Sequence, residues 1–294
     1  MRLTLLGTGS PVPMANRVSS GYVLEVGDEV LVFDHGGGAY QNFICAGFKA
    51  VDVNTMFFSH LHTDHCLDYA RFVHNRWDQG AGLVPELTVY APQYMHRMSE
   101  LLFMENGVFH PDLDGRLNSA GSRVVYTNRG GQLPRKRPAP EIISITDHQV
   151  IESDNWKVTI REVWHQPGYI EPYAIRLECN EGVFVYSGDT GPCDGIVEIA
   201  KDADLLVQMC YFISGTFNQD DGDLTSSGHL EAARIAAQAN VKTMVTTHFT
   251  PQMDTFGVRE KCLGEMADIF KGRIIWGEDL MKINIGEQKI PGAG

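Results

Sequence analysis

Cysteine is scarce in this 294-residue sequence, and its six cysteines never form a CxxC pair. They are scattered along the chain, at positions 45, 66, 179, 193, 210 and 262. Structural zinc sites of the finger type need cysteines paired at short spacing, so this arrangement argues against them. Free thiols in a reducing compartment are the simpler interpretation, and we expect a cytoplasmic protein.

Long hydrophobic runs are also missing from the sequence. The apolar run before Gly7 is too short for the core of a signal peptide. No segment approaches the roughly 18 consecutive apolar residues of a membrane-spanning helix. We therefore expect no membrane partner.

Basic residues are outnumbered, with 24 Lys and Arg against 37 Asp and Glu and a formal net charge of −13. Proteins that grip phosphate backbones usually carry a basic face. The acidic balance argues against nucleic acid as the partner, although basic residues can still gather locally.

Short apolar runs bounded by Gly, Asp or Asn predict β-strands in the first third of the chain, and a second series begins near residue 142. Helical periodicity follows the strands in each half, most clearly over residues 228–239. We expect two packed β-sheets with helices outside, in one α/β domain over residues 1–294. Residues 105–140, rich in Gly, Asn, Pro and Arg, predict an irregular excursion. Its basic end is either a solvated loop or an attraction for an anionic substrate.

Four metal-binding side chains lie within six residues of one segment, TMFFSHLHTDHCLD over residues 55–68. In an extended stretch His60 and His62 share one side, so both imidazoles can face one ion. Asp64 and His65 begin the next turn, where they can reach a second ion. Imidazole with carboxylate is a ligand set that Zn²⁺ favours, and we expect two Zn²⁺ per chain, with Mn²⁺ or Fe as alternatives.

Three further donors each follow an apolar strand elsewhere in the chain. His165 follows VTIREVW, Asp189 follows VFVYSG, and His248 follows TMVTT. Ligands that converge at one edge of a pair of sheets need this placement, so the three predict the rest of a two-metal site.

The run HLHTDH matches the HxHxDH signature of the metallo-β-lactamase superfamily, and the chain resembles this superfamily over nearly its whole length. The segments LLGTGSPVP, FDHGGG, SGDTGPCD and THFTPQ follow in the same order and are most similar to the ribonuclease Z branch. The resemblance implies a four-layer αββα sandwich and a homodimer. It also implies one metal on His60, His62 and His165, a second on Asp64, His65 and His248, and Asp189 bridging them.

The expected chemistry is hydrolysis by a metal-activated hydroxide. Asp64 is placed to bind metal and to orient or deprotonate the nucleophile. His229, at the start of the predicted helix, resembles a ribonuclease Z histidine and is the candidate proton donor to the leaving group, with a capping or surface role as the alternative. For His35, in FDHGGG, a supporting role at the site and a structural role both stay open.

Two departures from ribonuclease Z favour a small-molecule substrate. Only 23 residues separate His165 from Asp189, too few for the long tRNA-gripping arm of that branch. Met209 stands where the branch carries a glutamate. The first hypothesis is therefore hydrolysis of an ester, lactone, sulfate or phosphodiester, or hydrolytic dehalogenation of an aromatic. The alternatives are a ribonuclease Z-like RNA endonuclease and a catalytically silent binding protein.

Substrate choice is expected to depend on residues 211–228, which we place over the metals. Aromatic side chains here and elsewhere are candidates for the wall of a substrate pocket: Tyr211, Phe212, Phe217, Trp77, Phe103 and Phe109. The alternative is that most of them pack in the core. An RNA endonuclease would instead present a contiguous basic surface from Arg123, Arg129, Arg135, Lys136 and Arg137.

Overall fold

A computed structural model describes residues 1–216 and 225–286. The first half of the chain contains β1 (Arg2–Gly7), β2 (Gly21–Val26), β3 (Glu29–His35), α1 (Ala39–Cys45), η1 (Ala50–Asp52), β4 (Val53–Phe57), α2 (Thr63–Cys66), α3 (Tyr69–Gly80), β5 (Thr88–Ala91), α4 (Met95–Phe103), α5 (His110–Asn118), α6 (Ala120–Asn128) and β6 (Glu141–Ser144). The second half contains β7 (Val150–Glu152), β8 (Lys157–Glu162), β9 (Tyr173–Cys179), β10 (Gly182–Tyr186), α7 (Asp194–Ile199), β11 (Leu205–Met209), α8 (His229–Gln238), β12 (Thr243–Thr247), η3 (Pro251–Asp254), α9 (Val258–Ile269), β13 (Arg273–Trp276) and β14 (Lys282–Asn284).

The strands form two mixed sheets of similar design. The first has the order β14-β1-β2-β3-β4-β5-β6 and the second the order β13-β12-β11-β10-β9-β8-β7. In the first sheet β3 to β6 are parallel, and in the second β10 to β13 are parallel. Each sheet therefore brings several strand ends to the same edge, where loops can carry functional side chains.

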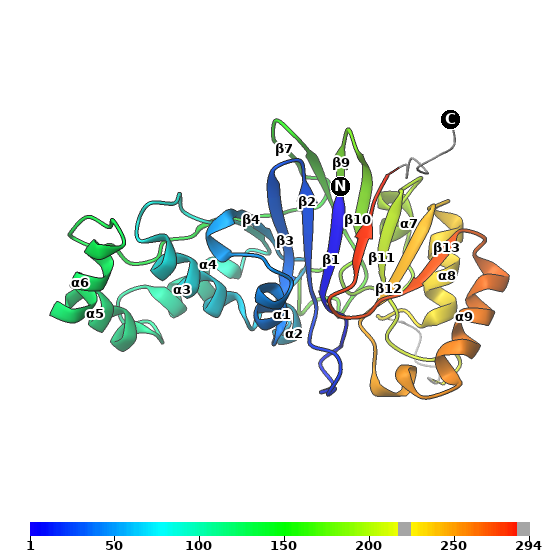
Figure 1. Ribbon diagram of the computed structural model, residues 1–294. Helices are drawn as coiled ribbons and strands as arrows, with labels where there is room; N and C mark the ends of the chain where they lie inside the picture. Colours follow the sequence, from blue (N-terminus) through cyan, green and yellow to red (C-terminus); the bar gives the residue numbers. More distant parts are fainter. Residues whose placement is uncertain (217–224, 287–294) are drawn as a thin grey trace, which may run out of the picture.

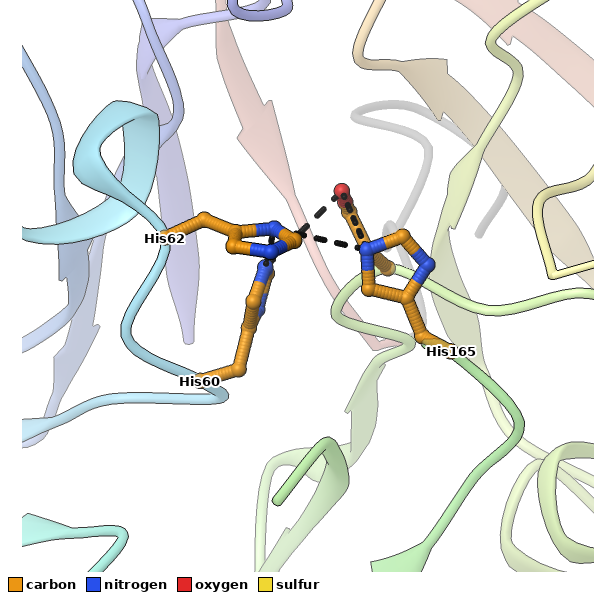
Figure 2. Close-up of side chains that lie close together, drawn as sticks. His60, His62 and His165 are labelled. Carbon is orange, nitrogen blue, oxygen red and sulfur yellow. Dashed lines mark hydrogen bonds and ion pairs between the residues drawn. The ribbon is translucent and has the colours of Figure 1, made fainter. Parts of the chain in front are cut away.

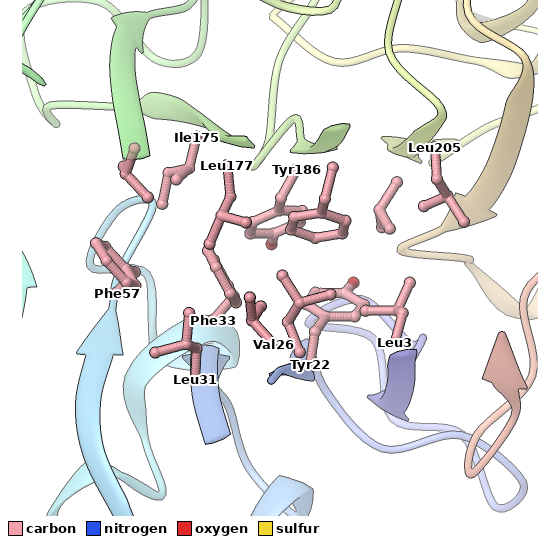
Figure 3. Close-up of a cluster of buried hydrophobic side chains, with 14 of the residues drawn as sticks. Leu3, Tyr22, Val26, Leu31, Phe33, Phe57, Ile175, Leu177, Tyr186 and Leu205 are labelled. Atoms are coloured by element: carbon pink, nitrogen blue, oxygen red, sulfur yellow. The ribbon is translucent and has the colours of Figure 1, made fainter. Parts of the chain in front are cut away.

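The two sheets pack face to face through a hydrophobic core, as alternating apolar residues on their strands require. Figure 3 shows Leu3, Tyr22 and Phe33 of the first sheet facing Leu177 and Tyr186 of the second. Phe33 stacks on Phe57 of the same sheet and meets Phe184 of the other edge to face. Aromatic pairs of this kind fix how the sheets sit against each other.

Helices cover the outer face of each sheet, which completes the four-layer αββα sandwich (Figure 1). Helices α1 to α4 pack on the first sheet through a second apolar cluster that includes Phe43 and Phe72. Helices α7 to α9 pack on the second sheet through a third, which includes Ile196 and Met266. The predicted fold class is confirmed. Across the described ranges, no helix has both the length and the apolar character that a membrane crossing needs.

The segment 105–140, which we expected to be irregular, contains two short helices. Pro111 lies in the first turn of α5, and Ser119 caps α6 by accepting a hydrogen bond from the Ser122 N–H. The two helices lie beyond α3 and α4, at the end of the molecule away from the sheets (Figure 1). The composition hid them because the Gly and Asn residues fall at helix ends and inside short helices, where a periodic apolar face is weak.

Candidate metal centre

The seven predicted ligands come together at one edge of the sheet pair. His60 and His62 follow β4, and α2 carries Asp64 and His65 immediately after them. The other three follow strands β8, β10 and β12, which run in the same direction in the second sheet. The carboxyl ends of these strands therefore deliver His165, Asp189 and His248 to the same edge.

The first ligand group contains His60, His62, His165 and Asp189, whose donor atoms all lie within 4.8 Å of one another. Three imidazoles point toward a common centre in Figure 2. The Nε2 atom of His60 lies 3.1 Å from Nδ1 of His62, and Nε2 of His165 lies 3.4 Å from the same atom. Two ligands of a tetrahedral zinc ion, each about 2.0–2.1 Å from it, stand roughly 3.3 Å apart. The spacing of these nitrogens fits a shared ion.

The second group contains Asp64, His65, Asp189 and His248, all of them buried. The Nε2 atom of His248 lies 3.1 Å from Oδ2 of Asp64 and 3.1 Å from Oδ2 of Asp189. The Nε2 atom of His65 lies 3.4 Å from a carboxylate oxygen of each aspartate. Asp189 belongs to both groups, so one carboxylate lies close to both sets of donor atoms.

The charges in the centre depend strongly on one another. Burial alone would raise the pKa of Asp189, but His248 and His65 outweigh it and hold that pKa far below its usual range. Burial lowers the pKa of His60, and the neighbouring His65 lowers it further. Burial lowers the pKa of His65, but the carboxylates of Asp189 and Asp34 more than reverse this and raise it well above its usual value. The centre therefore presents ionised carboxylates and a neutral His60, and metal binding would displace the proton from His65.

The donor set fits a resident metal. The Nε2 atom of His65 is buried without a hydrogen-bond partner in the described part of the chain, although it faces two carboxylates. A buried polar atom in that position is costly unless something binds it, and a divalent cation between the two carboxylates would do so. The two ligand groups together offer five imidazoles and two carboxylates, a donor set that suits divalent metal ions.

Asp34, which the sequence analysis passed over, supports the second ligand group. Its Oδ2 lies 2.7 Å from Nδ1 of His65 and accepts a hydrogen bond from the Tyr186 hydroxyl at 2.6 Å. Ser59 donates to both carboxylate oxygens, from its backbone N–H and its hydroxyl. A carboxylate behind a ligating imidazole fixes the orientation of the ring and its tautomer. Asp34 ends an apolar run, so the same strand-then-donor signal that marked the ligands also marked this residue.

Two glycines allow loops to approach the ligands closely. A Cβ at Gly36 would overlap the backbone carbonyl of Asp64. Gly188, which immediately precedes Asp189, has φ of 57° and packs against Ser59. A larger residue at Gly36 would push away the turn that carries Asp64.

The His229 ring forms hydrogen bonds with residues that are not candidate metal ligands. Its Nδ1 accepts the Ser214 N–H at 3.0 Å, and its Nε2 lies 2.7 Å from Oε2 of Glu265 on α9. Both ring nitrogens thus have partners outside the two ligand groups. Sequence reasoning missed Glu265, because it lies 36 residues further along the chain on another helix.

His35 and several predicted pocket aromatics pack inside the molecule. The His35 ring is fully buried against Tyr40, Phe43 and Phe72, and neither of its ring nitrogens has a hydrogen-bond partner among the described residues. Burial lowers the pKa of His35 to about 3. This environment is that of a neutral core histidine.

The aromatic wall that we expected over the metals does not form as a group. Phe103 is buried under the outer helices, and Trp77 packs against Arg135. Tyr211 does lie at the centre, with its ring 5.5 Å from that of His248. Phe217 lies outside the described residues. Most of these aromatics are spread through the helical layer because the core needs them there.

Comparison with known proteins finds similarity to one family model and to several ribonucleases. A family whose model is described as "Anti-Pycsar protein Apyc1" matches residues 1–97. Ribonuclease Z of Mycolicibacterium paratuberculosis is 29% identical over 293 aligned residues, which cover 97% of this chain and 98% of that protein. Ribonuclease Z of Salinispora arenicola is 28% identical, with 99% and 98% covered.

Solved structures share the fold. The metallo-β-lactamase fold protein YhfI from Bacillus subtilis superposes with a TM-score of 0.71 at 20% identity, over 96% of this chain and 98% of that one. The short form of human tRNase Z superposes with a TM-score of 0.68 at 18% identity, over 98% of this chain and all of that one.

These relatives correct our expectation of a small-molecule substrate without nucleic acid. The proteins that align with nearly the whole chain are named ribonuclease Z. Because the Mycolicibacterium alignment covers almost all of both proteins, a ribonuclease Z of similar length exists, and the short segment between His165 and Asp189 does not argue against RNA. The overall charge was equally uninformative, since it averages over a whole surface. The chain has the metallo-β-lactamase fold, is similar to ribonuclease Z over nearly its whole length, and is a metal-dependent hydrolase.

Proposed function

We propose that this protein is an RNA endonuclease of the ribonuclease Z type, which hydrolyses a phosphodiester bond at a centre holding two Zn²⁺ ions. One observation carries the proposal: the near full-length similarity to ribonuclease Z accompanies a complete set of seven side chains in two adjoining groups. Homodimerisation and a cytoplasmic location, both expected from the sequence, stay predictions.

The two ligand groups would divide the ions between them. His60, His62 and His165 would hold one, and Asp64, His65 and His248 would hold the other, with Asp189 shared. Divalent ions at such a centre activate water and stabilise the negative charge that develops on a phosphoryl group under attack. The protein itself holds the ligands in position, because they follow buried strands and because Asp34 contacts the His65 ring.

Asp64 is the residue we assign to orienting the attacking water. Burial raises the pKa of its carboxyl, but hydrogen bonds from His248 and His65 more than reverse this effect, and the pKa lies well below its usual range. Asp64 is therefore an ionised acceptor at working pH. An ionised carboxylate accepts a hydrogen bond from water and so directs a lone pair of the water oxygen toward the bond that is attacked.

His229 is the proposed proton donor to the leaving group, and in this role its ring would have to leave its present hydrogen-bond partner. Glu265 holds its Nε2 at 2.7 Å, so donation to RNA requires the ring to exchange this carboxylate for the substrate. We expect His229→Ala to slow cleavage of RNA, which has a poor alkoxide leaving group, more than cleavage of bis-p-nitrophenyl phosphate. Equal slowing of both substrates would instead indicate that His229 only anchors the turn at Ser214.

The helical projection of α5 and α6 supplies the local positive charge that RNA binding needs. Residues 105–140 carry six Lys and Arg against three Asp and Glu, in a chain of net charge −13. Arg116, Arg129 and Arg135 all bind the carboxylate of Asp78, and Arg116 also pairs with Asp112 at 2.9 Å. Three guanidinium groups on two acids leave a positive surplus, which favours contact with a phosphate backbone.

The substrate is tested with a 3′-extended precursor tRNA and the metal-loaded protein. We expect endonucleolytic cleavage that EDTA abolishes and that Asp64→Ala reduces by on the order of 100-fold or more. The matched control is Asp28→Ala, which removes an exposed carboxylate from the turn between β2 and β3 and should leave the rate unchanged. If the metal-loaded protein leaves RNA intact, or if Asp64→Ala cleaves as fast as wild type, the proposal is wrong.

A further inference from the structure

A groove lies beside the metal centre, between the start of α4 and the loop that follows His165. Its cavity volume is about 750 Å³, within the range of pockets that hold a ligand of nucleotide size. One wall includes Tyr94 and Arg97, the other includes Tyr169 and Glu171, and Leu61 forms part of the lining between them. None of these side chains belongs to the two ligand groups.

Two segments of the lining are close in the chain to members of the first ligand group. Leu61 stands in the chain between His60 and His62, so the lining of the groove is one residue away from two members of the first ligand group. Gln166, which follows His165 and is not part of the lining, has its Oε1 3.3 Å from Nε2 of His62. The Tyr169 N–H donates to the Gln166 carbonyl, which ties the turn bearing Tyr169 to the residue beside the ligand.

Two exposed tyrosines distinguish the groove chemically. The exposed fraction is 65% for Tyr94 and 90% for Tyr169. Aromatic rings held open to solvent along a groove are the surfaces on which successive bases of single-stranded nucleic acid stack. Because both residues contribute little to the core, their exposure is not explained by packing.

The charges of the groove suit bases better than phosphates. Arg97 pairs with Glu100 at 3.2 Å, and Glu171 accepts the Gln93 N–H at 3.1 Å. Two carboxylates against one guanidinium make the lining unfavourable for a phosphate backbone, whereas stacking on neutral bases carries no such penalty. The phosphate contacts would then fall to the basic helical projection and to the metals.

We propose that this groove holds unpaired nucleotides next to the scissile phosphodiester, with bases stacked on Tyr94 and Tyr169. The inference rests on the proposed RNA substrate and adds the form in which the RNA is recognised: a single strand at the cleavage point, bound through its bases.

The test measures dissociation constants by fluorescence anisotropy for a non-cleavable RNA that carries an unpaired segment, and for the same RNA with abasic residues in that segment. Tyr94→Ala and Tyr169→Ala should each weaken binding of the first RNA by on the order of tenfold and leave binding of the abasic RNA unchanged. Tyr94→Phe and Tyr169→Phe keep the ring and should bind as wild type does. Val150→Ala, on edge strand β7, removes exposed apolar surface elsewhere and is the matched control.

Two results would overturn the groove assignment: Ala variants that bind the base-containing RNA as tightly as wild type, or Phe variants that lose as much affinity as the Ala variants. Hydrolysis of bis-p-nitrophenyl phosphate, which has no base to stack, should be unchanged in all four tyrosine variants. Failure of the proposed function has a different signature, since wild-type protein would then not cleave RNA. Wild-type cleavage together with unaffected tyrosine variants would reject the groove alone.

Discussion

Asp34 accepts four hydrogen bonds with one carboxylate, and through them it links both sheets to a metal ligand. Two come from Ser59 in the first sheet's loop, one from Tyr186 of β10, and the fourth group is Nδ1 of His65. The residue has φ of 50°, a conformation that aspartate and asparagine tolerate better than most side chains. Its position is therefore specified by both backbone and side chain.

We expect Asp34→Asn to weaken metal binding by about 10- to 100-fold while the protein stays folded. Asparagine keeps the size and the backbone conformation but loses the negative charge behind His65. The measurement is metal affinity by competition with a chelator, with circular dichroism as the check on folding. Wild-type affinity in the variant would show that Asp34 does not support His65.

His35 gives a prediction about pH at the same scale. Burial lowers its pKa to about 3, whereas an unfolded chain takes up the proton near pH 6.5. The preference for a neutral ring therefore adds to the free energy of unfolding above pH 6.5. This contribution is lost as the pH falls from 6.5 toward 3.

We expect His35→Leu to flatten the acid loss of unfolding free energy by up to about 1.4 kcal/mol per pH unit in that interval. Chemical denaturation of both proteins at several pH values measures the difference. The metal content at pH 7.5 should be unchanged, because the ring packs among aromatic side chains. A folded variant that has lost its metal would instead give His35 a role at the centre.

Among the elements, the short helix α2 depends on how closely the loop after β3 can approach it. Gly36 is in van der Waals contact with the Asp64 carbonyl, where no side chain fits. We expect Gly36→Ala to displace α2 and lower metal affinity by at least tenfold, measured by the same competition. Gly115→Ala is the control, because a Cβ in α5 meets no neighbour and should stabilise that helix by about 0.5–1 kcal/mol. Equal metal affinity in the two variants would contradict this account of the loop.

The sequence predicted that the candidate ligands lie close together, and the physical reason operates at the level of elements. HLHTDH is compact, and His165, Asp189 and His248 each end a buried strand, so parallel strands had to bring them together. Glu265 could not be found in this way, because its contact with His229 depends on how α9 packs against α8. The groove lined by Tyr94 and Tyr169 could not be predicted for the same reason. Its walls come from segments some 75 residues apart, which meet only in the folded protein.

For the whole molecule, the substrate was the hardest property to predict. The net charge of −13 suggested a small molecule, whereas residues 105–140, which include α5, α6 and the segment after them, carry six Lys and Arg against three Asp and Glu. Electrostatic attraction acts locally, within about 8–10 Å at physiological salt, so a local surplus outweighs a distant deficit. The net charge of the whole chain therefore says little about whether one part of its surface can attract RNA.

The most direct test of the central claim follows RNA cleavage while metal is titrated into the metal-free protein. Cleavage of a 3′-extended precursor tRNA should be absent without metal, rise in proportion to bound metal, and stay absent in a folded His60→Ala variant. Cleavage that is equally fast in the metal-free protein, or intact RNA at full metal loading, would contradict the account.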